Sequence, residues 1–140
     1  LIDKTKYDDI LIMNSDLLTN IDFEDFFNFY KQTNATMVLA SIPYHVKVPY
    51  AVLETDEHQV SAFKEKPTYT FYSNGGIYLF DSKLKSKLTK GVFYNATDLI
   101  EKLIKQGKKV CSYPLTEYWL DIGKHTDYER AQNDINNIKF

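Results

Sequence analysis

A strand, a helix and a second strand follow one another early in the chain, and this order constrains the fold more than any other feature. Residues Ile10 to Met13 form a short apolar run between polar residues, which is typical of a strand buried on both faces. Asp22 can cap a helix in which aromatic residues recur at helical spacing until Thr33. The apolar run from Thr36 to Ala40 completes the unit, which predicts an α/β fold.

The remainder of the chain predicts further strands and two more helices. Asn95 can cap a helix that ends at Gly107, and the segment from Thr126 to Glu129 has the pattern of a capping box that opens a last helix. Short apolar or alternating runs predict strands, the first two of them paired as a hairpin, at residues 50–54, 60–64, 76–80 and 109–113.

Composition and charge exclude several classes of protein. A length of 140 residues fits one domain, and 44% hydrophobic residues indicate a globular chain. A net charge of -2 without a basic patch argues against nucleic-acid binding, and no apolar stretch reaches the roughly 20 residues that span a bilayer. The single cysteine, Cys111, lies in an apolar strand pattern and is expected in the core. These features predict a cytoplasmic protein without nucleic-acid or membrane partners.

Asp16 has an informative position, directly after the first predicted strand. Ligands of open α/β sheets collect beyond the carboxyl ends of the strands, where a carboxylate can hold a metal ion or act on a substrate. An isolated Asp at such a place is more often part of a turn. The surrounding sequence decides between the two interpretations.

The segment from Ile12 to Asp22 resembles the metal-binding segment of the sugar-1-phosphate nucleotidyltransferases, a family that includes mannose-1-phosphate guanylyltransferases and glucose-1-phosphate thymidylyltransferases. Many members have Gly at the position of Ser15. The resemblance implies that Asp16 is a catalytic Mg²⁺ ligand and that Asn14 contacts substrate. Mg²⁺ prefers carboxylate oxygens and keeps several waters.

A second block near the end of the chain resembles the family's Trp-x-Asp-x-Gly element. The resemblance implies that Asp121 is the second catalytic and metal-binding carboxylate and that Trp119 lies at the substrate. Two acids that converge on one ion both neutralise and orient it, which a single carboxylate does poorly. The alternative is a surface Asp at a turn.

The sequence Phe63 to Pro67 resembles the family's sugar-phosphate clamp. The resemblance implies that Glu65 accepts hydrogen bonds from sugar hydroxyls and that Lys66 neutralises the sugar phosphate, a catalytic role. Pro67 favours an extended backbone at Lys66, which sends successive side chains in opposite directions, so both reach one ligand only if the chain bends there. The alternative is a solvated charge cluster, and Lys64 is interpreted in that way.

Two further blocks resemble sugar-binding segments of the family. In the first, Tyr50 and Ala51 stand where relatives have Tyr-Gly, and the Cβ of Ala51 puts close backbone approach to the sugar in doubt. In the second, the resemblance implies that Asn74 contacts sugar hydroxyls and that Gly75 lines the pocket. Paired glycines before a strand are equally typical of a plain turn or bulge.

The resemblance implies a reaction in which a sugar 1-phosphate attacks the α-phosphorus of a nucleoside triphosphate, with GTP preferred, and pyrophosphate leaves. It also implies that residues 1–140 are the carboxyl-terminal, sugar-phosphate-binding and metal-binding part of a partial Rossmann-like, GT-A-like mixed sheet. The chain begins without Met and has no match for the family's Gly-rich basic loop. We therefore expect a piece of a longer protein that is inactive alone.

Two consequences and two alternatives complete the expectations. The strand from Ile10 to Met13 would have an open edge through which the chain forms homo-oligomers. A rival interpretation is a noncatalytic module that binds a sugar phosphate or regulates a partner, although two retained carboxylates argue against it. A third is a purely structural piece whose function resides in its parent protein.

Overall fold

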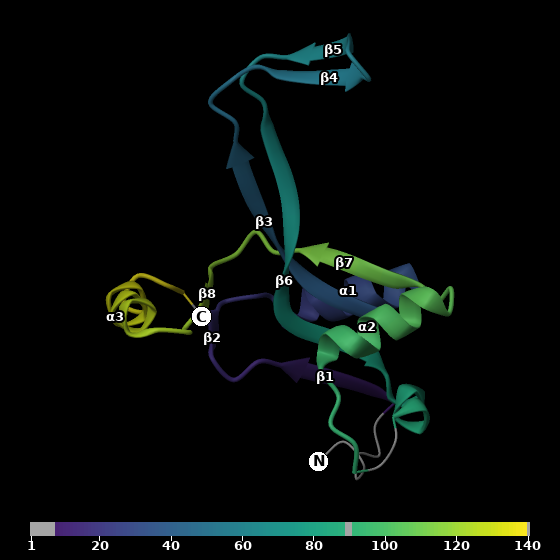
Figure 1. Cartoon of the computed structure of the whole chain (residues 1–140). Coiled ribbons are helices and arrows are strands. Elements are labelled where there is room, and N and C mark those ends of the chain that lie inside the picture. Colours follow the sequence, from purple (N-terminus) through teal and green to yellow (C-terminus); the bar gives the residue numbers. More distant parts are fainter. Residues whose placement is uncertain (1–7, 89–90, 140) are drawn as a thin grey trace.

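The protein is a mixed α/β structure, seen here in a computed structural model that describes residues 8–88 and 91–139. Within these residues the main sheet has the strand order β1-β6-β3-β7 (Figure 1). Its strands are β1 (Asp9–Met13), β3 (Met37–Lys47), β6 (Thr68–Asp81) and β7 (Val110–Pro114). Two smaller sheets pair β2 (Leu17–Thr19) with β8 (Trp119–Asp121) and β4 (Val52–Asp56) with β5 (Gln59–Lys64).

The predicted strand-helix-strand unit is confirmed, although its two strands are not neighbours in the sheet. β1 and β3 both run antiparallel to β6 and are therefore parallel to each other, with β6 between them. β7 extends the sheet by pairing parallel with β3. Helix α1 (Phe23–Thr33) connects the two parallel strands across one face, and α2 (Ala96–Lys105) lies on the other. The sheet is consequently mixed, as expected.

Two of the three predicted helix starts are confirmed. The carboxylate of Asp22 accepts hydrogen bonds from the first backbone N–H groups of α1. At α2 the backbone and side chain of Asn95 both donate to Asp98. The capping box predicted at Thr126 is wrong, because the N-cap of α3 (His125–Asp134) is Lys124, two residues earlier, and it makes no side-chain hydrogen bond. No helix among the described residues is both long enough and apolar enough to cross a bilayer.

Two apolar clusters cover the two faces of the sheet. The cluster under α1 contains Phe26 and Tyr30, and that under α2 contains Leu99 and Leu103. Cys111 is partly buried against the α1 cluster, which agrees in part with its expected place in the core.

The prediction that the first strand is buried on both faces is wrong. Leu11 is 47% exposed and Met13 is 37% exposed, whereas Ile10 is buried in the α2 cluster. The reason is topological, because β1 is an edge strand of the described sheet and α1 does not cover its second face.

β3 and β6 continue beyond the sheet as a two-stranded ribbon that ends in the β4–β5 hairpin (Figure 1). The pairing shifts register between Leu39 and Ser41, at the point where the ribbon leaves the sheet. Along the ribbon Tyr44, Phe71 and Tyr72 are exposed. A two-stranded ribbon without a packed face has little to hold its shape, so this arm is expected to bend easily.

The fold should lose stability at alkaline pH through two buried tyrosines. Burial, and secondarily a hydrogen bond to Asp9 or Asp25, raises the pKa of Tyr30 and of Tyr113 above the ordinary 10.0. Because the folded state holds these protons more tightly, the stabilisation is complete below pH 10 and is lost as the pH rises through the folded pKa values. Urea denaturation at about pH 9 and 11 should therefore show a falling free energy of unfolding, and Tyr113→Phe should reduce that fall. An equal fall in the variant would contradict the assignment.

Candidate functional site

The pairing of β2 with β8 brings the chain segments that carry the two predicted metal-binding residues, Asp16 and Asp121, side by side. Leu17 is the register partner of Asp121, and the backbone N–H of Ile122 donates to the carbonyl of Asp16 over 2.8 Å. Both aspartates are exposed at the carboxyl end of β1. Residues that are far apart in the sequence thus lie on neighbouring segments, and their joint binding of a metal ion stays a prediction.

Side chains just after Asp16 fix the segment that carries Asp121. The hydroxyl of Thr19 donates to the carbonyl of Tyr118 over 2.7 Å, and the Asn20 side chain accepts from the N–H of Tyr118 at 2.9 Å. The Tyr118 hydroxyl donates to Asp134 of α3 at 2.6 Å, which lowers the pKa of that carboxyl. Thr19 and Asn20 are positioning residues that the sequence interpretation missed, although they lie in the same block as Asp16.

Trp119 of β8 and Asn14, which follows β1, both form hydrogen bonds with β6. The indole N–H of Trp119 donates to the carbonyl of Gly75 over 2.9 Å, and the backbone N–H of Asn14 donates to the carbonyl of Gly76 over 2.9 Å. Trp119 also packs against the α1 cluster and is partly buried. The indole therefore has a clear structural role, and its predicted contact with substrate stays a prediction.

Asn74 lies beside these residues with its amide already engaged. Its Oδ1 accepts from the backbone N–H of Gly76 at 3.0 Å, and its Nδ2 donates to the Tyr78 hydroxyl at 2.8 Å. One donor hydrogen and one lone pair of the exposed amide stay available to a ligand. We define the metal-side cluster as the residues Asn14, Asp16, Asn74, Gly75, Trp119 and Asp121.

The paired glycines are a bulge inside β6 and not a turn. A Cβ on Gly75 would lie 2.9 Å from the carbonyl oxygen of Ala40, so the two backbones approach too closely for any side chain. Gly76 has a φ of +73°, a conformation that favours glycine, and a Cβ there would lie 2.7 Å from Asn14 Nδ2. The bulge thus permits the close packing of β6 against β3 and Asn14.

The other predicted site residues gather where the ribbon meets the β4–β5 hairpin. The backbone N–H of Val48 donates to the carbonyl of Pro67 at 3.0 Å and closes the end of the ribbon. On the hairpin side of this bond, residues 49–51 and 65–66 are exposed. We define the hairpin-side cluster as Tyr50, Ala51, Glu65 and Lys66.

The bend required at Lys66 is present, although its backbone is not extended as Pro67 favoured. Lys66 has a φ of +41°, a sparsely populated conformation for a residue with a side chain. It brings Lys66 Nζ within 4.0 Å of Glu65 Oε1, so the two side chains can face one ligand. Ala51 has no positive φ, and its backbone conformation does not require glycine.

The structure does not bring the two clusters together. Thr68 and Asn74 lie six positions apart along β6, which corresponds to roughly 20 Å along an extended strand. Figure 1 shows the same separation, with β2 and β8 beside the main sheet and the hairpin at the far end of the ribbon. The predicted site is therefore divided between the β2–β8 region beside the main sheet and the far end of the ribbon.

The chemistry of the paired aspartates fits Mg²⁺. The described residues contain no group of three His, Cys, Asp or Glu side chains that could hold a metal ion. Mg²⁺ does not need such a cage, because it is usually held by one or two carboxylates, waters and substrate phosphates. Asp16 and Asp121 can supply those two carboxylates on an exposed surface that phosphates can reach.

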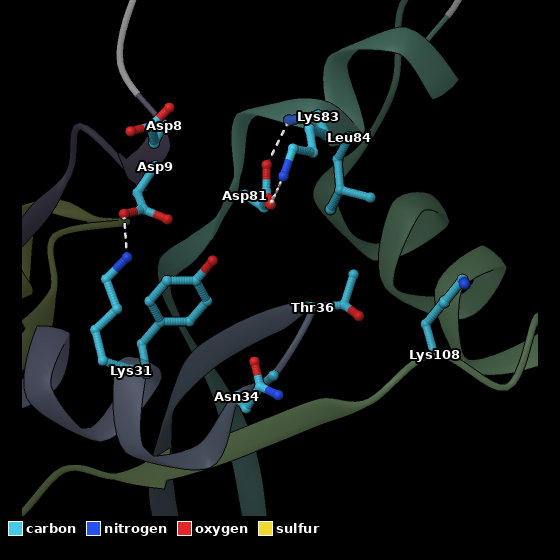
Figure 2. Close-up of a pocket in the computed structure, with 11 residues that line it drawn as sticks. Asp8, Asp9, Lys31, Asn34, Thr36, Asp81, Lys83, Leu84 and Lys108 are labelled. Atoms are coloured by element: carbon cyan, nitrogen blue, oxygen red, sulfur yellow. Dashed lines mark hydrogen bonds and ion pairs between the residues drawn. The ribbon is translucent and has the colours of Figure 1, made fainter.

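A hollow of about 500 Å³ lies elsewhere, at the amino-terminal ends of β1 and β3. Figure 2 shows Lys31 paired with Asp9 and Lys83 paired with Asp81 on its walls. Lys31 Nζ lies 2.5 Å from Asp9 Oδ2, which fastens α1 to the start of β1. These pairs give the hollow a structural explanation, and it contains none of the predicted site residues.

Comparison with known proteins gives consistent relatives. The chain is 26% identical over 138 residues to a glucose-1-phosphate adenylyltransferase of Clostridium perfringens, covering 90% of this chain and 36% of the relative. It is 29% identical over 134 residues to a D-glycero-alpha-D-manno-heptose 1-phosphate guanylyltransferase of Aneurinibacillus thermoaerophilus, covering 94% and 58%.

The fold has solved counterparts. The crystal structure of HddC from Yersinia pseudotuberculosis matches with a TM-score of 0.67 at 19% identity, covering 96% of this chain and 58% of that one. The chain thus spans between about a third and three fifths of the length of these relatives. The Nucleotidyl transferase family model matches residues 1–138. Together with the observed mixed sheet, this match shows that the chain belongs to the nucleotidyl transferase family.

Proposed function

We propose that this chain is the acceptor and metal-binding part of an enzyme that transfers a nucleoside monophosphate to a sugar 1-phosphate. The observation that carries the proposal is that β2 and β8 place the backbone segments of Asp16 and Asp121 side by side. Family membership and relatives named for glucose 1-phosphate and heptose 1-phosphate support it.

In the proposed reaction the residues act by placing charged groups. Asp16 and Asp121 would hold Mg²⁺, which neutralises charge developing on the phosphates. Lys66 would place the phosphate of the sugar, while Glu65 and Asn74 would bind sugar hydroxyls. The attacking phosphate oxygen is already an anion, so the mechanism requires no general base. Positioning then supplies most of the rate enhancement.

The separation of the two clusters has a consequence for this proposal. A sugar phosphate is shorter than the roughly 20 Å between Thr68 and Asn74, so Lys66 and the aspartates reach one substrate only if the ribbon bends. The exposed ribbon and its register shift at Leu39 and Ser41 offer a place for that bend. We propose that the substrate draws the hairpin-side cluster toward the metal-side cluster.

The finer assignments are also proposals. We favour GTP as the nucleotide and a mannose-like or heptose-like sugar phosphate, because one of the relatives is named a heptose guanylyltransferase. We propose that the described part does not catalyse transfer alone, since its candidate groups serve the sugar phosphate and the metal. A cytoplasmic location agrees with the supply of nucleoside triphosphates that the reaction needs.

The proposal predicts Mg²⁺-dependent binding of a sugar phosphate that requires Lys66. In calorimetric titrations with mannose 1-phosphate and related sugar phosphates, Lys66→Ala should weaken binding by at least about tenfold, because a charge-assisted contact contributes about 1.5–3 kcal/mol. Omission of Mg²⁺ should have a similar effect.

Lys64→Ala is the matched control. Lys64 lies two residues away on β5 and is paired with Glu54 at 2.5 Å, so its loss should leave binding unchanged. Equal weakening by both substitutions would indicate only general electrostatic attraction. Binding that needs neither Mg²⁺ nor Lys66 would favour a noncatalytic binding module. No binding to any sugar phosphate would contradict a preformed acceptor site in this chain.

A further inference from the structure

The sheet that carries the two candidate metal-binding segments is too short to fix its own shape. Within the described residues, β2 and β8 contribute three residues each and form a sheet separate from the main one. A two-stranded pair is marginally stable without further contacts. At one end of this pair the N–H of Ile122 donates to the carbonyl of Asp16 over 2.8 Å. The spacing between Asp16 and Asp121 therefore depends on what holds the other end.

Tyr118 lies at that other end and is held from two sides. Its carbonyl accepts from the Thr19 hydroxyl over 2.7 Å and its N–H donates to Asn20 Oδ1 over 2.9 Å, so its backbone is bound to the block that contains Asp16. Its own hydroxyl donates to Asp134 Oδ2 of α3 over 2.6 Å. A phenol this close to a carboxylate forms a charge-assisted hydrogen bond, about twice as strong as one between neutral groups. Tyr118 thus joins β8, the Asp16 block and α3.

α3 and the segment after it hold their side of this link in place. Arg130 lies one helical turn before Asp134, and its Nε donates to Asp134 Oδ2 over 3.2 Å, which keeps the carboxylate oriented. Beyond the helix, the carbonyl of Lys139 accepts from Asn20 Nδ2 over 3.0 Å. The chain after β8 therefore returns to the same two positions, Tyr118 and Asn20, that fix β8 against β2.

We propose that Tyr118 is a positioning residue through which α3 sets the spacing of Asp16 and Asp121. The inference rests on the proposed Mg²⁺ site and adds to it a residue that acts only through the two aspartates. Mg²⁺ accepts oxygen ligands only at about 2.0–2.1 Å and in nearly octahedral directions. When the Tyr118 hydroxyl or its acceptor is lost, both carboxylates remain, but the start of β8 is freed on one side. The carboxylates then meet these limits less often, and the ion binds more weakly.

Titration of the full chain with Mn²⁺, which accepts the same oxygen ligands and broadens nearby nuclear resonances, tests the proposal. Tyr118→Phe should raise the dissociation constant at the two aspartates about three- to tenfold, since partners that orient metal ligands change metal affinity by about tenfold or more and Tyr118 acts from three residues away. Tyr113→Phe is the matched control, because it removes a hydroxyl that donates to Asp25 of α1 over the same 2.6 Å. It should lower the free energy of unfolding to a similar extent and leave the affinity for Mn²⁺ unchanged.

Substitutions of Asp134 test the same link without changing the tyrosine ring. Asp134→Asn and Asp134→Ala remove the same charge, but only Asn retains a side-chain oxygen that can accept from the Tyr118 hydroxyl. Asp134→Asn should therefore bind Mn²⁺ more nearly like the wild type, whereas Asp134→Ala should weaken binding as much as Tyr118→Phe does. Tyr118→Phe added to Asp134→Ala should cause little further loss, because one shared hydrogen bond cannot be lost twice.

The outcomes separate this proposal from the one on which it rests. Equal Mn²⁺ affinity in the wild type, Tyr118→Phe and Asp134→Ala overturns the positioning role and leaves the metal site standing. Additive losses in the double variant, or equal weakening by Tyr113→Phe and Tyr118→Phe, overturn it as well. If the wild-type chain shows no broadening at Asp16 or Asp121, the metal site itself is wrong and the positioning role is overturned with it.

Discussion

Replacing Asp121 by Asn is expected to raise the dissociation constant for a divalent ion at least tenfold, or about 1.4 kcal/mol. Asn keeps the shape of the side chain but removes the charge that would balance the ion. The ion is best followed as Mn²⁺, which accepts the same oxygen ligands and broadens the nuclear resonances of nearby residues. In the wild-type chain the broadening should centre on Asp16 and Asp121, whose backbone segments are joined by the pairing of β2 with β8.

A double-mutant cycle shows whether the two carboxylates hold one ion. If they do, Asp16→Asn added to Asp121→Asn should cost much less than Asp16→Asn alone, because one shared interaction cannot be lost twice. Asp56→Asn, on an exposed strand of the hairpin, controls for the loss of one negative charge. Additive effects, or broadening centred on Asp56, would show that the aspartates do not form a common site.

The parts of the fold that depend on local pattern were predictable from the sequence. Asp22 and Asn95 cap helices because the side chain and the backbone that it caps are a few residues apart. The β4–β5 hairpin is likewise set by its own turn. At α3 the same reasoning failed, because the helix begins at His125 behind Lys124, whose side chain makes no capping hydrogen bond, rather than after Thr126.

The parts that depend on distant strands were not predictable from periodicity. An apolar run such as Ile10 to Met13 predicts a strand but cannot reveal that β1 lies at an edge, since this depends on where β6 returns. The prediction that Asp16 and Asp121 act together came from the family resemblance, and the pairing of Leu17 with Asp121 shows that their backbone segments are neighbours. No pattern in the sequence indicated the distance between Lys66 and Asn74.

Gly76→Ala should destabilise the fold by about 2–4 kcal/mol. Two costs combine: the backbone strain of a positive φ in a residue with a side chain, and the overlap of the new Cβ with Asn14. The new Cβ should displace Asn14, whose N–H also bonds to the carbonyl of Gly76. This displacement should move the start of the loop that carries Asp16. Urea denaturation measures the first effect, and Mn²⁺ affinity measures the second.

Gly107→Ala separates the two costs, because Gly107 has a φ of +65° and no atom within 4 Å of the position of its Cβ. It should show the backbone cost alone, and the excess at Gly76 is then the steric cost. Asn14→Ala in the Gly76→Ala chain should recover most of that excess by removing the Asn14 atoms that lie 2.7 and 2.9 Å from the new Cβ. If Gly76→Ala cost no more than Gly107→Ala, Asn14 would have room to move, and the close fit between β6 and the loop before Asp16 would not position the carboxylate.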